Sequence, residues 1–479
     1  MSLGRRAARG AFWVAAGSWV NRLMLLVVLA VLARRLSPRE FGVLSVLGLA
    51  RNALVIFGGF GFADAVVYQR DRIRAAAATA FTATTVLGGL LGLALVPAAP
   101  LVAAFFHVPE AASPIRAYAL VIAASTAGRI PLAALTRDLA FGKRFVPEGV
   151  GSVAGGLVTV GAALAGSGVW AVVVGDLVRE LLVLILAVTV LPDRFGFGWN
   201  WEVALTAWRY ARHALASELF EFGLQNVDYA LVGRLLGPTA LGLYTLAFRV
   251  AILPFLTVTY VVGGVSFPFY ARAAADLGRV RDAFRSTFNL SMAVMALLAG
   301  GLVFLAPSLQ VLGSKWAPAV PVARALALYV CLRSAAHLMT PLLAGTGHPG
   351  ADAALRACWF LLLAGAVAGV AHAGITAVAV AQVAVAATML VAYAEVARRL
   401  VGVRPAVVAA TLARLAVAVA LAGIAVLGLR LLDGVWAADE SWTTLLLLGT
   451  GFVLAYAMAA WLLIPEVVAD ARRLRTHLV

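Results

Sequence analysis

Charged residues are scarce in this sequence. Only 13% of its 479 residues are Asp, Glu, Lys or Arg, whereas 63% are hydrophobic, and the mean hydropathy is +0.97. A water-soluble domain of this size and composition would expose large apolar patches. The composition therefore excludes a soluble globular protein and predicts an all-α polytopic membrane protein.

The motifs of nucleotide hydrolysis and metal catalysis are missing as well. The sequence contains no G-x-x-x-x-G-K-[ST] phosphate loop and no H-E-x-x-H, and its six histidines are scattered. Its two cysteines, Cys331 and Cys358, lie in separate apolar stretches without the spacing of a metal site. We expect no cofactor, no metal and no enzymatic activity.

Aromatic residues are not interleaved with basic runs, although Lys and Arg outnumber Asp and Glu by 38 to 22. In a membrane protein the ordinary cause of such an excess is cytoplasmic loops rich in Arg and Lys. Nucleic acid is therefore not an expected partner.

Apolar runs of the length that a bilayer requires, about 20 residues, occur fourteen times. They lie near residues 11–33, 42–68, 77–105, 113–135, 147–166, 169–191, 210–233, 240–267, 284–306, 320–345, 354–371, 373–394, 406–429 and 442–464. With the N-terminus inside, 23 of the 38 basic residues fall on the cytoplasmic side and 8 on the outside. This bias predicts 14 transmembrane helices with both termini cytoplasmic.

A short motif recurs 200 positions apart. The stretch A-R-R-L-S-P-R-E-F-G-V-L at 33–44 returns as V-G-R-L-L-G-P-T-A-L-G-L-Y at 232–244, so that Pro38 aligns with Pro238 and Gly42 with Gly242. Each copy lies between two apolar runs, which predicts a tight outer turn with Pro fixing φ and Gly easing the return.

The repeat predicts two lobes of six helices related by a pseudo-two-fold axis along the membrane normal, with an additional C-terminal hairpin. The expected divisions are an N-terminal lobe, a cytoplasmic linker, a C-terminal lobe, and an extra helix pair with a cytoplasmic tail. They cover residues 1–191, 192–208, 209–396 and 397–479.

Several polar residues fall within the apolar runs, where ionisable groups are costly and commonly face a cavity or a partner. Glu218, Glu221, Gln225 and Asp228 share one stripe of the seventh span, and Asn21 and Arg22 occupy a corresponding depth in the first. We expect these stripes to line a cavity, with Glu221 at mid-span. Alternatively, Glu218 is interfacial and Asp228 pairs with Arg234.

Other charges within spans include Arg51 and Arg249, which follow the two motif copies at similar distances. Arginine offers a planar fork to phosphate oxygens, so both are candidates for an acidic substrate. Asp176 and Arg179 are expected to form an internal ion pair. Pro254 is the expected hinge, and Gly151 with Gly155 should permit close helix packing.

The order and wording of these segments resemble the oligosaccharide flippases of the multidrug/oligosaccharidyl-lipid/polysaccharide exporter superfamily. The segments that carry the resemblance are L-A-R-R-L-S-P-R-E-F-G at 32–42, G-F-G-F-A-D-A-V-V-Y-Q-R at 59–70, G-V-W-A-V-V-V-G at 168–175 and N-V-D-Y-A-L-V-G-R-L-L-G-P-T-A-L-G-L-Y at 226–244.

The resemblance implies translocation of an undecaprenyl-diphosphate-linked oligosaccharide across the cytoplasmic membrane by alternating access, for synthesis of surface polysaccharides such as O-antigen or lipopolysaccharide. It implies the lipid bilayer, the lipid-linked substrate, a polysaccharide polymerase and other assembly proteins as partners. Under it, Arg22, Arg51 and Arg249 hold the diphosphate or acidic sugars, and Glu221 and Asp228 are counter-charges or a cation-coupling site.

Three alternatives remain open. Two belong to the same superfamily, a drug/cation antiporter and a lipid II flippase. An excess of arginine within the spans disfavours a cationic substrate. The third is a membrane-embedded glycosyltransferase or polymerase, for which the sequence offers only the short loop with Asp433, Asp439 and Glu440.

Overall fold

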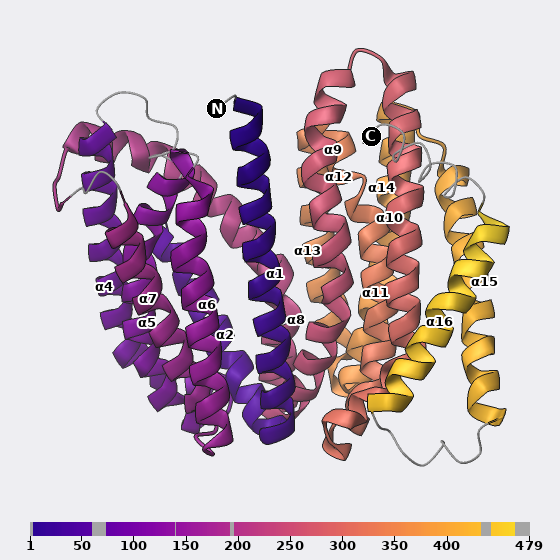
Figure 1. Ribbon diagram of the computed structural model, residues 1–479, viewed down its shortest axis with the longest axis horizontal. Coiled ribbons are helices and arrows are strands. Elements are labelled where there is room, and N and C mark those ends of the chain that lie inside the picture. The colour runs from indigo at the N-terminus through magenta and orange to yellow at the C-terminus, as the bar shows by residue number, and fades with distance from the viewer. Residues whose placement is uncertain (1–2, 60–72, 139, 192–195, 433–441, 465–479) are drawn as a thin grey trace. The chain divides into compact units, whose positions relative to one another are not determined.

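The computed structural model describes residues 3–59, 73–138, 140–191, 196–432 and 442–464, and every regular element in these ranges is a helix (Figure 1). The first seven long helices are α1 (Leu3–Arg35), α2 (Pro38–Gly59), α4 (Ile73–Phe105), α5 (Ala112–Arg137), α6 (Phe141–Leu164), α7 (Trp170–Val190) and α8 (Trp201–Pro254). They are followed by the π-helical turn η2 (Phe255–Thr259), α9 (Tyr260–Ala273), α10 (Leu277–Leu305), α11 (Val320–His337), α12 (Thr340–Gly345), α13 (Pro349–Val370), α14 (Ile375–Val401), α15 (Pro405–Leu432) and α16 (Trp442–Leu463).

Ten stretches of the described chain are long and apolar enough to cross a membrane. One of them, Phe222–Ala273, has 52 residues and would extend about 78 Å as a straight helix, far beyond the roughly 30 Å of a bilayer core. Its helix is interrupted at Gly237, where φ is 83° and ψ is 178°. The stretch is therefore long enough for two crossings, as the sequence predicts.

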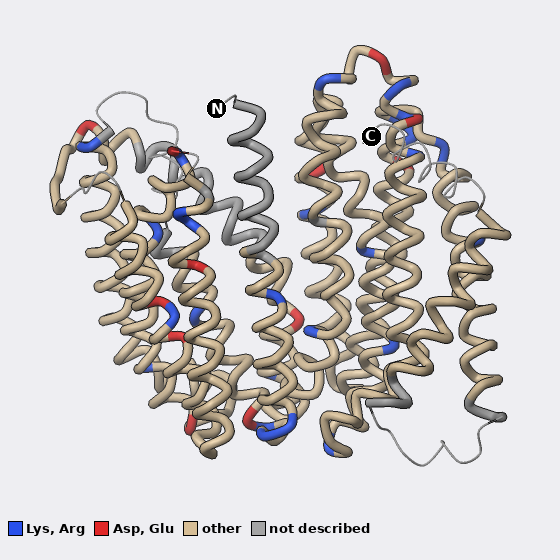
Figure 2. The backbone as a smooth tube through the Cα atoms, viewed as in Figure 1, with Lys and Arg blue, Asp and Glu red and all other residues tan. Residues whose placement is uncertain are grey.

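Charged positions are few along the helices and long uncharged segments separate them (Figure 2). Many large apolar side chains are exposed on these segments, among them Leu101, Val265, Leu361 and Val391. Such surfaces are stable against lipid and unstable in water. The protein is a multi-pass membrane protein.

The helices form two compact units, Met1–Gly242 and Leu243–Val479. In the first unit α5 packs against α4 and α7, while α6 packs between α1 and α7. In the second unit α11 packs against α10 and α14, and α13 packs against α14. The division falls inside α8, within the last residues of the second motif copy. The boundaries at 191, 208 and 396 remain predictions about the repeat.

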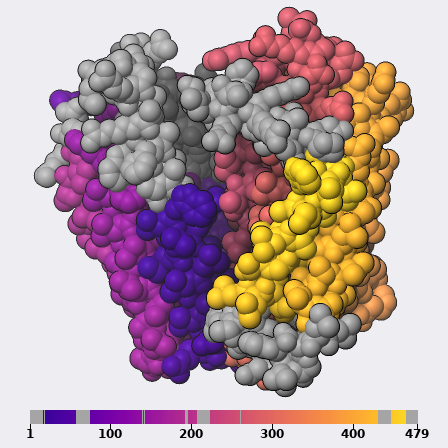
Figure 3. All heavy atoms as spheres, turned by 45° about the vertical axis from the view of Figure 1, so that its right-hand side comes forward, coloured from indigo at the N-terminus to yellow at the C-terminus, as the bar shows by residue number. Residues whose placement is uncertain are grey.

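The C-terminal helix pair belongs to the second unit. α15 and α16 pack against each other and against α10, and α16 lies over the outer surface of this unit (Figure 3). The Tyr456 hydroxyl donates to the Ala293 carbonyl at 2.7 Å, and the Thr411 hydroxyl donates to Asn289 Oδ1 at 2.8 Å. Buried polar contacts of this kind fix the hairpin to α10.

The first motif copy forms the predicted turn between α1 and α2. α2 begins at Pro38, and the residue before it, Ser37, exchanges hydrogen bonds with Glu40: Ser37 N–H donates to Glu40 Oε2 at 2.8 Å and Glu40 N–H donates to Ser37 Oγ at 3.3 Å. This reciprocal arrangement is a capping box, with Pro at the first helical position. In the second copy Gly237 takes the place of Ser37, which allows the positive φ before Pro238.

The two glycines of the motif have a different role from the one predicted. Gly42 lies within α2, and a Cβ there would overlap the carbonyl oxygen of Pro238; a Cβ on Gly242 would overlap the carbonyl oxygen of Pro38. The two copies therefore contact each other reciprocally through backbone atoms. The glycines permit this close approach of two helix beginnings instead of easing a turn, which the spacing along one chain could not reveal.

Candidate functional site

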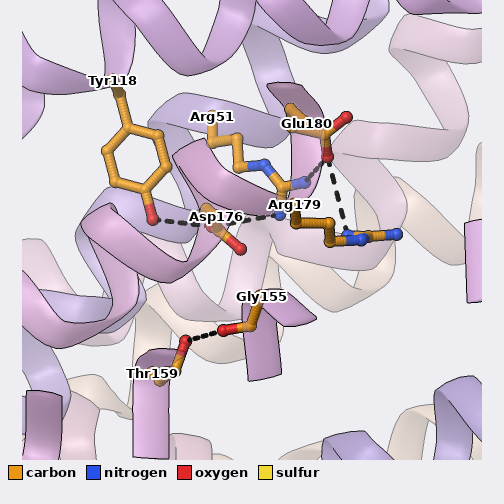
Figure 4. A network of polar contacts seen from close by, with 7 residues as sticks. All are labelled: Arg51, Tyr118, Gly155, Thr159, Asp176, Arg179 and Glu180. Carbon is orange, nitrogen blue, oxygen red and sulfur yellow. Dashed lines mark hydrogen bonds and ion pairs between the residues drawn. The ribbon is translucent and has the colours of Figure 1, made fainter. Parts of the chain in front are cut away.

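A network of charged side chains joins three helices of the first unit (Figure 4). Arg51 on α2 lies between two carboxylates of α7, with Nη1 3.5 Å from Asp176 Oδ2 and Nη2 3.1 Å from Glu180 Oε1. Tyr118 on α5 donates its hydroxyl to Asp176 Oδ2 at 3.0 Å, and Arg179 Nη1 lies 3.7 Å from Glu180 Oε1. Two guanidinium groups thus compensate two carboxylates.

The partners in this network differ from the predicted ones. Asp176 and Arg179 lie on one face of α7, as their spacing requires, but Asp176 pairs with Arg51 and Arg179 pairs with Glu180. The prediction of an Asp176–Arg179 pair was wrong, because helical spacing identifies a shared face and not the neighbour that a second helix supplies.

Small residues bring α6 and α7 close together beside the network. A Cβ on Gly155 would contact Arg179 Cβ and the Gly175 carbonyl, and one on Gly151 would contact Val183 and the Arg179 carbonyl. The Thr159 hydroxyl donates to the Gly155 carbonyl at 2.9 Å. The predicted close packing at Gly151 and Gly155 is confirmed, and it fixes the α7 backbone that carries the two carboxylates.

The predicted residues of the first span lie on α1, which packs against α6. Ser152 on α6 donates its hydroxyl to Asn21 Oδ1 at 2.8 Å, and Arg22 is half-buried. The Asn21 contact was not expected from the sequence, because Ser152 had no distinguishing pattern.

The predicted stripe of the seventh span lies on the first part of α8. Asp228 is buried, with 2% of its surface exposed, and Gln225 is exposed. The side chains of Glu218 and Glu221 lie outside the described residues. The alternative pairing of Asp228 with Arg234 was wrong, because Arg234 instead contacts His107 Nε2 at 2.7 Å, the Phe105 carbonyl at 3.1 Å and the Phe105 ring.

The remaining predicted residues belong to the second unit. Arg249 is half-buried on the later part of α8, and Pro254 is the last residue of that helix. The π-helical turn η2 follows Pro254 directly. In this unit Asp352 on α13 pairs with Arg356 at 2.9 Å and accepts from the Tyr393 hydroxyl of α14 at 3.1 Å.

The described residues were also compared with the requirements of a metal site. No group of three or more His, Cys, Asp or Glu side chains that could hold a metal ion occurs within the described ranges. The polar groups that the structure brings together in these ranges form ion pairs and hydrogen bonds between helices.

Comparison with known proteins identifies the family. The family described as "Polysaccharide biosynthesis protein" matches residues 31–321, which is more than half of the chain. The chain belongs to this family. The matched range includes both copies of the motif and the network of charged side chains on α2, α5 and α7. The family predicted from the sequence is confirmed.

Curated relatives of the chain come from three bacteria. The succinoglycan biosynthesis transport protein ExoT of Rhizobium meliloti is 30% identical over 352 residues, covering 73% of this chain and 70% of ExoT. The teichuronic acid biosynthesis protein TuaB of Bacillus subtilis is 24% identical, covering 69% and 70%. The lipopolysaccharide biosynthesis protein WzxC of Escherichia coli is 24% identical, covering 70% and 69%.

Solved structures with a similar fold include two membrane proteins. The lipid II flippase MurJ in an inward closed conformation matches with a TM-score of 0.74 and 10% identity, covering 95% of this chain and 99% of MurJ. A multidrug resistance MATE family transporter of the MOP superfamily, in an inward-facing conformation, matches with a TM-score of 0.65 and 13% identity, covering 79% and 94%. At these identities the likeness concerns the fold alone.

Proposed function

We propose that the protein is a flippase that moves an undecaprenyl-diphosphate-linked oligosaccharide from the inner to the outer leaflet of the cytoplasmic membrane by alternating access. Membership of the polysaccharide biosynthesis family is the observation that carries the proposal. The name of the relative ExoT, a biosynthesis transport protein, supports movement of a polysaccharide precursor instead of its synthesis. In this role the chain is a transporter and not an enzyme.

The proposed topology has 14 transmembrane helices and two six-helix lobes, with both termini cytoplasmic. The ten apolar stretches found by length and composition support it, as does the length of the stretch Phe222–Ala273, whose helix is interrupted at Gly237. α7 is not among the ten, and it carries Asp176, Arg179 and Glu180. A helix whose charges are paired within the protein can still cross a bilayer.

The proposed substrate pathway uses Arg22, Asn21, Arg249, Gln225, Asp228 and Glu221. Arg22 and Arg249 hold the diphosphate or acidic sugars, since guanidinium groups bind phosphate oxygens through two donors. Glu221 and Asp228 serve as counter-charges or as a coupling site. Arg51 is the exception, because Asp176 and Glu180 already neutralise it, and we assign it to bracing α7.

A cell-based experiment tests the proposal. Deletion of the gene should abolish the surface polysaccharide and accumulate the lipid-linked oligosaccharide on the cytoplasmic leaflet, and the wild-type gene should restore export. Arg22→Ala should insert normally and fail to restore it, whereas Arg324→Ala, an exposed arginine outside the proposed pathway, should restore it. Unchanged surface polysaccharide in the deletion strain would refute the function.

The same strains separate the alternatives. A lipid II flippase, suggested by the likeness to MurJ, would make the deletion lethal instead of stripping a surface polymer. A drug antiporter would make the strain sensitive to cationic compounds. If the chain were a glycosyltransferase or polymerase, the deletion strain would accumulate shorter or unextended oligosaccharides. Export would then fail because the finished product is not made.

We also propose functional partnership with a polysaccharide polymerase and other assembly proteins. A flipped oligosaccharide at the outer leaflet requires a reaction that joins repeat units and regenerates the lipid carrier. Co-purification of the chain with the polymerase of the same biosynthetic pathway would support a physical complex.

A further inference from the structure

Arg333 lies inside a candidate membrane span and is held by aromatic rings. In the stretch Ser314–Gly345 nineteen residues precede it and twelve follow it, which places it near the middle. Its guanidinium lies 4.9 Å from the ring centre of Phe255 and 5.9 Å from that of Tyr329, within the range of cation–π contact. Nη1 donates to the Tyr329 hydroxyl at 3.3 Å.

No ion pair to Arg333 occurs within the described parts of the chain. Its Nε and Nη2 donate to no described residue. Nε of Arg51 and Nε of Arg179 are buried without a hydrogen-bond partner, whereas Nε and Nη2 of Arg333 are not buried. The Nε–Nη2 edge of Arg333 is therefore accessible.

Aromatic rings and carboxylates have different effects on the charge and the free N–H donors of an arginine. A carboxylate neutralises the guanidinium and occupies its N–H groups, as Glu180 does for Arg51 at 3.1 Å. Aromatic rings attract the cation but carry no countercharge. Because no described residue accepts from Nε or Nη2 of Arg333, its positive charge and these donors remain available. Arg333 thus keeps the fork that binds phosphate oxygens in pairs.

The surroundings of Arg333 are fixed by neighbouring contacts. Phe255 begins the π-helical turn η2, and the Phe255 and His337 rings meet edge to face at 5.2 Å. Thr259, at the end of the same turn, donates its hydroxyl to Ser334 at 3.0 Å. Irregular turns of this type are frequent at functional sites, and this one positions a ring over the cation. Because the rings fix its side chain, Arg333 is not a residue that extends freely to the membrane surface.

We propose that Arg333, supported by Phe255 and Tyr329, binds the diphosphate group of the lipid-linked substrate in the second unit. The inference rests on the proposed function and adds to it a contact on α11, outside the stripes of α1 and α8. Its ligand chemistry is a phosphate oxygen pair facing the Nε–Nη2 edge.

Binding of farnesyl diphosphate to the purified full-length protein in an uncharged detergent tests this contact. Arg333→Gln should weaken binding about tenfold or more, because a charge-assisted pair of hydrogen bonds is lost. Arg333→Lys should weaken it less, since the charge stays and the fork is lost. Arg324→Gln, an exposed arginine of the same helix whose Nε donates to the Val303 carbonyl, should bind like the wild type.

Farnesol and farnesyl monophosphate distinguish a direct contact from a structural one. Loss of a direct contact should lower affinity for the diphosphate most, for the monophosphate less, and leave farnesol binding unchanged. A parallel loss for all three ligands would overturn the proposal. If Arg333→Gln does not fold, Arg333→Lys and Tyr329→Phe give the same comparison with the aromatic packing retained.

Nanodiscs distinguish the substrate from an anionic lipid headgroup. Farnesyl diphosphate should bind equally well in phosphatidylcholine discs and in discs containing phosphatidylglycerol. Complete competition by phosphatidylglycerol that disappears in Arg333→Gln would assign the site to membrane lipid and overturn the proposal.

The outcomes also separate this inference from the proposed function. Farnesyl diphosphate binding by the wild type with equal affinity in Arg333→Gln would overturn the inference and leave flippase function standing. No diphosphate binding by the wild type, together with normal surface polysaccharide in the deletion strain, would overturn both.

Discussion

Arg51 shows how an arginine inside a membrane protein can serve the scaffold. Its two carboxylate partners are 19% and 12% exposed, so little water is available to replace the guanidinium. Loss of one partner from a mostly buried ion pair costs more than the pair itself contributes, because a charge remains uncompensated. The same reasoning separates this residue from Arg333, whose contacts leave its charge unneutralised.

Substitution of Arg51 should therefore destabilise the protein. Arg51→Met leaves Asp176, Arg179 and Glu180 with one excess negative charge and should lower the free energy of unfolding by about 2 kcal/mol or more. The double substitution Arg51→Met with Glu180→Gln removes the excess charge and should recover much of this loss. Thermal unfolding of the purified variants measures both effects.

Export by the double variant decides what Arg51 does. If the residue braces α7, the neutralised double variant should restore surface polysaccharide in the deletion strain. Full stability without any export would instead assign Arg51 to the substrate, as the sequence alone predicted.

At the residue scale, the sequence predicted which charged side chains share a helix face, but it did not predict the residues on other helices that pair with them. The sequence placed Asp176 and Arg179 on one face of α7, but no local pattern links them to Arg51, which lies 129 positions before Glu180. Tyr118 and Ser152 carried no signal at all, because a single hydroxyl within an apolar run is common. Partners of this kind become visible only when the helices are packed.

At the scale of an element, the motif copies at 33–44 and 232–244 combine a helix start with a helix contact. Ser37, Pro38 and Glu40 define where α2 begins, and the sequence predicted that turn from Pro38. The reciprocal approach of Gly42 to Pro238 and of Gly242 to Pro38 depends on both copies at once.

A methyl group at the motif glycine should disrupt this contact. Gly42→Ala places Cβ against the Pro238 carbonyl, a backbone atom that cannot rotate away, and should destabilise the protein by about 1–3 kcal/mol or more. Size-exclusion chromatography and thermal unfolding in detergent measure the loss. The control is Gly48→Ala in the same helix, where no atom lies within 4 Å of the new Cβ and the better helix propensity of Ala should leave stability equal or slightly higher. Equal stability of the two variants would contradict the contact.

The second element with a testable role is the join of α8 and η2. Pro254 lacks an N–H and its ring interferes with the preceding turn, and the following π-helical turn widens the helix there. Pro254→Ala should fold and insert like the wild type but export more slowly, because the flexible join stiffens. A variant that exports at the wild-type rate would remove the hinge role from Pro254.

At the scale of the whole molecule, the sequence predicted the helical membrane architecture, but it predicted few of the contacts between helices. The apolar runs and the 200-residue offset predicted an all-helical membrane protein, which the structure bears out, and 14 helices, which stays a prediction. The sequence also predicted the family, which residues 31–321 confirm. It did not predict the α10 contacts of the C-terminal helices, since Asn289 and Thr411 are 122 positions apart. Glu221 remains a prediction, because its side chain lies outside the described residues.

Translocation by the purified protein tests the central claim most directly. The protein is reconstituted into liposomes with a fluorescent undecaprenyl-diphosphate oligosaccharide, and a membrane-impermeant quencher reports the fraction in the outer leaflet. The account predicts that wild-type protein exchanges the lipid between leaflets far faster than protein-free liposomes and that Arg22→Ala does not. Exchange at the protein-free rate by correctly folded wild-type protein, with all required ions and an imposed ion gradient present, would contradict it.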